Sequence, residues 1–401
     1  MKNKIEKLIT FLTNNLYERD EAIHLTLLAL FAEESIFLYG KPGLGKSNLA
    51  KLVKNIIRNG QIFEYLMNKY STPDEIFGPL DIDKLTHGEY FRRTEGYLPG
   101  ADVAFLDEIW KAGPSIQNTL LTIINEKEFR NGNKVNRVPL KLLISASNEF
   151  PEENQGLEAL YDRFLIRYEI TPIKDFDNIL KMVNYNPAKL DVTLQAEDLI
   201  TPEMITQISE VVDGKKGQFI TLSEEVIAFI DKLKANIEAK TGIYISDRRW
   251  KKVIRLMKVS AHCSGRDKVE MVDTFVVNHT LWNKLNNNTV NERNEINLIY
   301  KELMNKEIGI KNEASWAETE IKSLTVQVKN VLKNNFSDRN YTKEIGTRYK
   351  SILKRISQER STLTKASSVF FPVAFNGIDG VDVEIRNDFE KSFAKLQKMV
   401  G

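Results

Sequence analysis

The residues best suited to chemistry form one glycine-rich loop. Gly40-Lys41-Pro42-Gly43-Leu44-Gly45-Lys46-Ser47 directly follows the apolar run 36–39 and opens a helical pattern. Glycines let such a loop wrap tightly and aim its backbone N–H groups at phosphate oxygens. The lysine places a positive charge on the β- and γ-phosphates, and the serine hydroxyl can bind Mg²⁺. The sequence therefore predicts a site for ATP and Mg²⁺, with nucleotide contacts from Gly40, Lys41, Pro42, Gly43, Leu44, Gly45, Lys46, Ser47 and Asn48.

Two adjacent carboxylates supply the second part of the predicted site. The apolar run 103–106 ends in Asp107 and Glu108. We expect Asp107 to hold the hydration shell of the metal, for which Ser47 is the other protein ligand. We expect Glu108 to accept a proton from the attacking water. The alternative is an acidic helix cap that follows a strand and does no chemistry.

A polar side chain ends the next apolar run. Residues 142–147 lead directly into Asn148. An asparagine at the carboxyl end of a strand beside the phosphate loop can orient water and sense the γ-phosphate. The alternative is an asparagine that only caps the turn before Pro151.

Five short apolar runs provide the strands that would position these groups. They cover residues 35–39, 62–67, 103–106, 140–146 and 167–170. Short buried strands separated by helices predict a parallel α/β sheet with its ligand at the carboxyl ends of the strands. Apolar residues at helical spacing predict two helices within residues 5–31, and from about Ile173 helical patterns replace the strand runs.

Composition restricts the classes of function. The chain carries 57 basic and 55 acidic side chains, so its formal net charge of +2 offers no broad basic surface for wrapping nucleic acid. Cys263 is the single cysteine, which suits a reducing compartment. The first residues lack the long apolar stretch of a signal peptide, and no run approaches the roughly 18 apolar residues of a membrane span. We therefore expect a cytoplasmic protein with no transmembrane segment, for which nucleic acid is not the expected partner.

The loop, the acidic pair and the Asn148 strand, in this order, resemble AAA+ ATPases. Further segments narrow the resemblance to the MoxR type and, within it, to the RavA-like subgroup. These segments are 63–67, 71–80, 96–99, 105–114, 118–130, 145–149 and 157–163, and the similarity extends over roughly residues 15–285. The resemblance implies an AAA+ P-loop core with N-terminal helices at 1–190, an all-α lid at 191–285 and a mainly helical C-terminal bundle at 286–401.

The resemblance also implies a role for Arg163, which lies in the segment 160–164. This residue matches the arginine finger, which reaches the γ-phosphate bound in the neighbouring subunit. A planar and permanently charged guanidinium suits the stabilisation of transition-state charge. The alternative is a local ion pair between Arg163 and Asp162.

Two further sets of nucleotide-linked residues follow from the same resemblance. Arg248 matches the second sensor of the helical lid, and the adjacent Arg249 is the alternative for that role. Tyr17 and Arg19 lie where the N-terminal segment of the family borders the adenine.

The resemblance implies two insertions as well. Residues 78–99 resemble a hairpin-bearing insertion, and the turn at 130–133 resembles the start of a second hairpin. Such hairpins face the pore or a bound partner in ring ATPases. Residues 286–401 are too few for the helical domain and the β-rich domain found in RavA-like proteins. We expect a helical bundle with at most a few short strands around 367–383, and core packing in this last domain for Phe370 and Phe371.

The predicted function is ATP hydrolysis by a ring of identical subunits, six by family expectation, coupled to remodelling of a protein partner. Hydrolysis would move the lid through Arg248. The resemblance implies a client system that includes a protein with a von Willebrand factor A domain. Two alternatives stay open: a nucleic-acid motor of the same clade, and a nucleotide-gated scaffold in which ATP binding alone controls assembly.

Overall fold

The computed structural model describes residues 1–151, 157–183, 194–217, 219–282, 292–307, 314–334, 338–363, 368–371 and 383–400. The chain divides into two compact units. The first comprises Met1–Leu222, Ser246–Val269 and Ser368–Phe370, and the second comprises Ser223–Ile245, Glu270–Ser367 and Phe371–Gly401. The domain boundaries expected near residues 190 and 285 fall in stretches outside the described residues, so these limits stay predictions.

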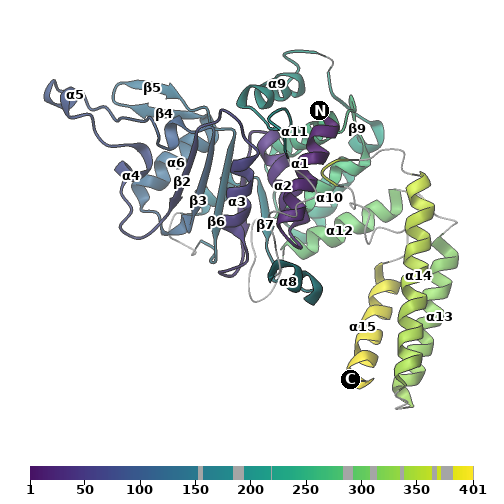
Figure 1. The fold of residues 1–401 in the computed structure, drawn as a ribbon. Helices are drawn as coiled ribbons and strands as arrows, with labels where there is room; N and C mark the ends of the chain where they lie inside the picture. Colours follow the sequence, from purple (N-terminus) through teal and green to yellow (C-terminus); the bar gives the residue numbers. More distant parts are fainter. Residues whose placement is uncertain are drawn as a thin grey trace. The chain divides into compact units, whose positions relative to one another are not determined.

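The first unit is built on a five-stranded parallel sheet with the order β2-β3-β6-β1-β7 (Figure 1). Its strands are β1 Ser35–Tyr39, β2 Ile62–Leu66, β3 Val103–Asp107, β6 Leu142–Ser147 and β7 Ile166–Glu169. Every predicted run became a strand, with small differences at the ends. The central strands β1, β3 and β6 are almost wholly buried and mostly apolar, and for this reason their runs could be recognised in the sequence. Strands β2 and β7 each include charged residues. The order places β6, which leads to Asn148, between the strand before the phosphate loop and the strand before the acidic pair.

Two N-terminal helices pack in this unit, as predicted. They are α1 Lys2–Asn15 and α2 Asp20–Phe31, and α2 buries every residue from Ala22 onward. A helix that is apolar on all sides belongs in a core. Helix α2 contacts β1, and α1 contacts α2, so the N-terminal segment is part of the same fold as the parallel sheet.

Three helices connect the strands that matter for the site. Helix α3 (Lys46–Asn55) starts within the phosphate loop, α6 (Pro114–Glu126) follows β3, and α7 (Glu158–Arg163) precedes β7. Helix α6 leaves the carboxyl end of β3 and leads the chain back toward the amino end of β6. The last turn of α6 therefore lies on the side of the sheet opposite the phosphate loop.

Both insertions form hairpins. The first follows helix α4 (Pro73–Phe77) and contains helix α5 (Ile82–Thr86), and an antiparallel bridge between Leu80 and Arg92 closes it. The second is the antiparallel pair β4 (Glu128–Asn131) and β5 (Lys134–Arg137). Its two-residue turn begins at Gly132 with φ of +61°, the left-handed conformation that a type II′ turn requires at this place. The second hairpin is therefore confirmed.

The rest of the first unit is mostly helical. It contains α8 (Phe176–Val183), α9 (Pro202–Val212) and α11 (Asp247–Cys263), with one short parallel pair, β8 Thr221–Leu222 and β9 Lys268–Val269. The expectation that strands end near Ile173 is corrected by this pair. Each of its strands has only two residues, too few to give a sequence signal.

The segment Ser368–Phe370 also belongs to the first unit, which corrects the expectation for Phe370. The Ser368 and Ser260 hydroxyls are 2.9 Å apart, and the Phe370 ring lies 6.2 Å from that of Phe31. Phe370 is therefore a core residue of the first unit and not of the last domain. Phe371 lies in the second unit, where its ring is 5.5 Å from that of Phe275, a residue outside the range 286–401 expected for the last domain.

The second unit is helical in its described residues. It contains α10 Glu224–Thr241, the 3₁₀ segment Met271–His279, α12 Glu292–Glu307, α13 Ala314–Lys333, α14 Arg339–Leu363 and α15 Val383–Val400. The core of the last three helices includes Ile321, Leu324 and Phe389, all fully buried. The strands expected around 367–383 fall mostly on residues 372–382, outside the described part of the chain. No helix in the described residues of the chain is long and apolar enough to cross a membrane.

Candidate active site

The phosphate loop joins β1 to α3. Gly45 precedes the helix with φ of +85°, a left-handed conformation that costs glycine little. Gly40 lies so close to β7 that an added Cβ would come within 2.6 Å of the Ile170 carbonyl oxygen. The predicted contacts from Lys41 to Asn48 are all in this loop or in the first turn of α3, whose backbone N–H groups are free to bind anions.

Lys46 is buried inside the loop, and only 7% of its surface is exposed. Its ammonium donates to the carbonyl of Gly40 and, at 3.1 Å, to that of Lys41. Burial lowers the pKa of Lys46, while the carboxylates of Asp107 and Glu108 oppose that shift. The lysine is thus held at the loop by backbone oxygens, and phosphate oxygens could take their place.

The two predicted metal ligands are adjacent. The Ser47 hydroxyl donates to Asp107 Oδ2 at 3.1 Å, although 60 residues separate them in the chain. A hydroxyl and a carboxylate beside a phosphate loop are the oxygen ligands that Mg²⁺ takes together with nucleotide phosphates and water. Among the described residues there is no cluster of three or more acidic, His or Cys side chains that could hold a metal alone. The donor set therefore fits a metal that arrives with its nucleotide.

Glu108 adopts an unusual backbone conformation, with φ of +53° and ψ of +43°. Non-glycine residues in this region are uncommon and gather at functional sites. Its carboxylate Oε2 lies 3.3 Å from Lys111 Nζ and 3.5 Å from the Ser147 hydroxyl. Sequence reasoning missed both partners. The spacing of Lys111, three residues beyond Glu108, and the place of Ser147 at the end of β6 are the signals that could have indicated them.

Asn148 follows β6 at the same edge of the sheet. Its side-chain oxygen Oδ1 is buried and has no hydrogen-bond partner in the described structure. Buried polar atoms are nearly always paired, so an unpaired one beside a nucleotide loop suits a ligand or a bound water.

The N-terminal segment reaches the phosphate loop through Arg19. This arginine is buried, and its Nε donates to the Leu44 carbonyl at 3.1 Å. Burial lowers the pKa of Arg19. Tyr17, the other residue expected near the adenine, is partly buried two positions earlier. The intervening Glu18 accepts backbone N–H groups at the start of α8, 2.8 Å from Lys174 N and 2.9 Å from Asp175 N.

Arg163 lies at the amino edge of the sheet, where the parallel strands begin. The phosphate loop lies at the carboxyl edge, where they end. Strand β7 runs parallel to β1, with Ile166 beside Ile36. Arg163 precedes β7 and is therefore at the amino edge, whereas the phosphate loop follows the carboxyl end of β1. The structure thus brings together Lys46, Ser47, Asp107, Glu108 and Asn148, and it separates Arg163 from them.

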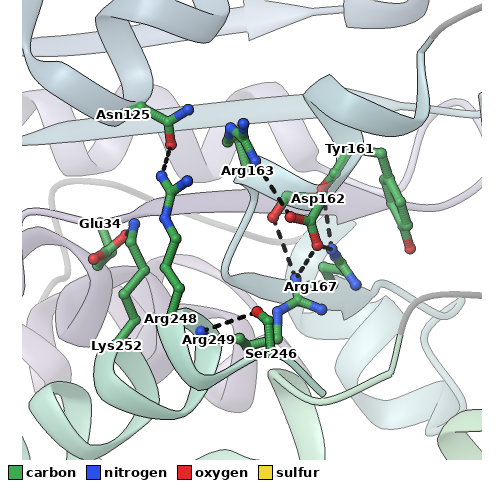
Figure 2. A network of polar contacts seen from close by, with 10 residues as sticks. All are labelled: Glu34, Asn125, Tyr161, Asp162, Arg163, Arg167, Ser246, Arg248, Arg249 and Lys252. Carbon is green, nitrogen blue, oxygen red and sulfur yellow. Dashed lines mark hydrogen bonds and ion pairs between the residues drawn. The ribbon is translucent and has the colours of Figure 1, made fainter. Parts of the chain in front are cut away.

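A network of arginines surrounds Asp162 at this amino edge (Figure 2). Asp162 forms an ion pair of 3.3 Å with Arg163 and of 3.4 Å with Arg249, and Arg167 is 4.0 Å away. The local pairing that was the alternative for Arg163 is therefore present. The Arg163 Nε is buried without a hydrogen-bond partner in the described structure.

Arg248 also lies at the amino edge of the sheet. Its guanidinium donates to the Asn125 side chain in the last turn of α6. One turn further along α11, Lys252 forms a 2.7 Å ion pair with Glu34, the residue immediately before β1. A cavity of about 20 Å³ is lined by Asn125, Asp162, Arg163, Leu165, Ser246, Arg248, Arg249 and Lys252. Within this chain Arg248 therefore lies beside Arg163 and not beside the phosphate loop.

Comparison with known proteins agrees with this architecture. A family model described as the MoxR domain in MoxR-vWA-beta-propeller ternary systems matches residues 3–210, and a model of an AAA lid domain matches residues 225–297. A crystal structure of a candidate ATPase from Cytophaga hutchinsonii has the same fold, with a TM-score of 0.58 at 20% identity, over 74% of this chain and 93% of that one.

Sequence relatives extend this likeness. Two uncharacterised proteins of Methanocaldococcus jannaschii are each 38% identical over 284 residues. The alignments cover 71% and 70% of this chain, and 71% and 72% of the relatives. A structural protein of Acidianus two-tailed virus is 31% identical over 247 residues, which are 58% of this chain and 40% of the viral protein. The RavA-like subgroup is not singled out by these matches and stays a prediction. The chain belongs to the MoxR family of AAA+ ATPases.

Proposed function

We propose that this protein hydrolyses ATP at sites divided between neighbouring copies of the chain in a ring, six by family expectation. The observation that carries the proposal is the position of Arg163 at the amino edge of the sheet, across from the phosphate loop of its own subunit. An arginine there cannot reach the nucleotide that its own Lys46 holds. A neighbouring subunit can present its own amino edge to that nucleotide.

Within one subunit, each group at the carboxyl edge has a separate task. Lys46 leaves its two carbonyl partners for the β- and γ-phosphates. Ser47 and Asp107 would hold Mg²⁺, which neutralises phosphate charge when bound. Glu108 accepts the proton of the attacking water, and Lys111 and Ser147 fix its carboxylate. Asn148 orients the same water with its unpaired amide oxygen.

The neighbouring subunit supplies the remaining positive charge. Arg163 is only weakly engaged, since its partner Asp162 also interacts with Arg249 and Arg167. A γ-phosphate has more charge than a shared carboxylate and can displace it. Arg248 has a neutral amide as its partner and is available as a second cation at the same interface. In this proposal the second sensor acts together with the finger on one nucleotide, and this revises the idea that Arg248 moves the lid in response to its own ATP.

The hydrolysis of ATP drives the remodelling or activation of a protein partner. The matching family model is named for systems that combine a MoxR domain with a von Willebrand factor A domain, and we propose a protein with such a domain as a partner. The two insertion hairpins would contact the client. A near-neutral net charge favours a protein client over nucleic acid.

The test is the ATPase rate as a function of protein concentration, for the wild type and for Arg163→Ala, with and without double-stranded DNA. A specific activity that rises with concentration, collapses in the variant and ignores DNA supports the divided site. Activity that is independent of concentration and survives the substitution overturns it. Strong stimulation by DNA, lost at high salt, identifies a nucleic-acid motor instead. ATP-dependent assembly without any turnover identifies a nucleotide-gated scaffold.

A further inference from the structure

The two insertion hairpins are joined to each other by one side chain. The Arg92 N–H donates to Asn131 Oδ1 at 2.7 Å, and Asn131 Nδ2 donates to the Arg92 carbonyl at 2.9 Å. Next to this contact, a Cβ at Gly132 would come within 2.3 Å of the Tyr90 carbonyl oxygen. Asn131 is 2% exposed, so the paired amide is sealed from solvent. Segments about 40 residues apart in the chain therefore form one rigid element.

Strand β4 has one edge that the described structure leaves unpaired. Lys127 and Val138 are joined by a hydrogen bond from Val138 N, and the same register continues to the pair of Asn131 and Lys134. Hydrogen-bonded pairs alternate with non-bonded pairs along an antiparallel ladder. Glu128 and Arg130 occupy the non-bonded positions, so their N–H and C=O groups point away from β5. In the described part of the chain, no hydrogen bond engages these four groups.

The unpaired edge borders a groove of about 480 Å³. Its lining includes Phe77 and Phe129, two core residues that are only 2% and 4% exposed and whose ring centroids are 5.7 Å apart. One wall is a face of α6 with only hydroxyl and amide side chains: Ser115, Asn118, Thr119 and Thr122. The other wall is the first hairpin, with Tyr90 and Arg92.

The charges of the groove do not favour a strongly anionic ligand. The Arg92 guanidinium is already engaged by the Asp74 carboxylate and the Gly78 carbonyl. Glu128 and Arg130 have opposite charges and lie on the same strand. Alternating free donors and acceptors beside a neutral polar wall match the backbone of an extended polypeptide.

We propose that the edge of β4 binds an extended segment of a client polypeptide by β-strand addition. The segment pairs with the N–H and C=O groups of Glu128 and Arg130 and lies along the hydroxyl and amide side chains of α6. This inference deepens the proposed remodelling function, because it names the state in which a client is held: unfolded or locally extended chain. Because the two hydrogen bonds between Asn131 and Arg92 join the hairpins, both hairpins move with the bound segment.

The test uses a permanently unfolded probe, fluorescein-labelled α-lactalbumin that has been reduced and carboxymethylated, with binding followed by fluorescence anisotropy. Arg130→Pro removes the outward N–H of β4 without touching the bonds to β5, a position where a strand tolerates proline. We expect its affinity to fall about tenfold. Arg137→Pro is the matched control, because it removes an outward N–H from the far edge of β5. Its affinity for the probe should equal that of the wild type. Arg130→Ala keeps the N–H and should also bind normally.

Wild-type affinity in Arg130→Pro, equal losses in Arg130→Ala, or no saturable binding by the wild type overturns strand addition. Should Arg130→Pro misfold, hydrogen exchange of the wild type replaces it: the amides of Glu128 and Arg130 must gain protection with the probe, and those of Val135 and Arg137 must not. ATPase activity measured on the same samples separates this proposal from the divided site, because a chain can bind the probe without hydrolysing ATP, and the reverse.

Discussion

The carboxylate of Asp162 lies 3.4 Å from the guanidinium of Arg249, 87 residues further along the chain. Arg249 also donates to the Asp162 backbone carbonyl at 3.3 Å. This pair fastens the start of α11 to the end of α7, and it thereby places Arg248 on the same edge as Arg163. The positions of the two proposed trans-acting arginines are therefore set by one structural contact.

A divided site predicts complementation between inactive variants. Arg163→Ala and Lys46→Ala should each lose about 10³-fold or more in ATPase rate, because one lacks the finger and the other cannot hold the phosphates. In an equal mixture, about a quarter of the interfaces combine an intact Lys46 with an intact Arg163 from the next subunit. The mixed sample should recover up to that fraction of the wild-type rate in a steady-state phosphate-release assay.

The control for complementation is a chain with both substitutions. A mixture of this double variant with Arg163→Ala contains no intact interface and should stay inactive. If the mixture of single variants also stays inactive while it assembles normally, Arg163 does not act on a neighbouring nucleotide.

Substitution of the two adjacent arginines at the start of α11 should have different effects on activity and on stability. Arg248 faces a neutral amide, so Arg248→Ala should lower the ATPase rate and change the free energy of unfolding by less than about 0.5 kcal/mol. Arg249 is 6% exposed and paired to Asp162, so Arg249→Ala should lower the free energy of unfolding by about 1–3 kcal/mol. Urea unfolding of both variants, with their ATPase rates, distinguishes the sensor from the structural residue. The opposite pattern would assign the sensor to Arg249.

Glu108→Gln should separate nucleotide binding from turnover. The amide preserves the shape of the side chain but cannot accept the proton, so kcat should fall about 10²- to 10⁴-fold. The affinity for ATP should stay within about threefold, since the phosphate contacts from Lys46 are intact. Rapid-quench hydrolysis and equilibrium binding of a fluorescent ATP analogue measure the two quantities. Asp107→Asn is the matched comparison, because it should weaken binding only when Mg²⁺ is present. Normal hydrolysis by Glu108→Gln would mean that another group is the base.

The sequence predicted those features that depend on short stretches of chain. The five strands are short runs rich in apolar residues, and the loop from Gly40 to Ser47 has a fixed spacing, so both were recognisable without a structure. Pairing of Ser47 with Asp107 followed from the rule that the carboxyl ends of parallel strands share an edge.

Features that depend on packing between distant segments were not predictable. Nothing local to Arg248 shows that α11 lies against Glu34 and Asn125 at the amino edge. The roles of Lys111 and Ser147 beside Glu108 depend on the left-handed backbone conformation of Glu108, which is uncommon for a residue other than glycine. The segment Ser368–Phe370 reaches the first unit through side-chain contacts over more than 100 residues of sequence.

A final prediction concerns Lys127, which ends α6 in a left-handed conformation with φ of +55°. It has no ion pair or hydrogen bond from its ammonium in the described structure, since the neighbouring Glu34 and Glu33 are paired with Lys252 and Lys141. Burial lowers the pKa of Lys127 to about 8; the two glutamates raise it and the two lysines lower it further. The cationic side chain therefore costs stability at neutral pH.

The sign of the pH effect follows from the proton counts. The unfolded chain releases the Lys127 proton near pH 10.5 and the folded chain near pH 8, so between these values the unfolded state binds more protons and stability rises with pH. Lys127→Met keeps the apolar stem and removes the charge. It should raise the free energy of unfolding by about 1–3 kcal/mol at pH 7, and this gain should shrink toward zero by pH 10.5. Urea unfolding of both chains at the two pH values measures the difference. A gain of equal size at both would attribute the effect to packing and not to the buried charge, and Lys252→Met, which breaks the ion pair with Glu34, should show no stabilisation at either pH.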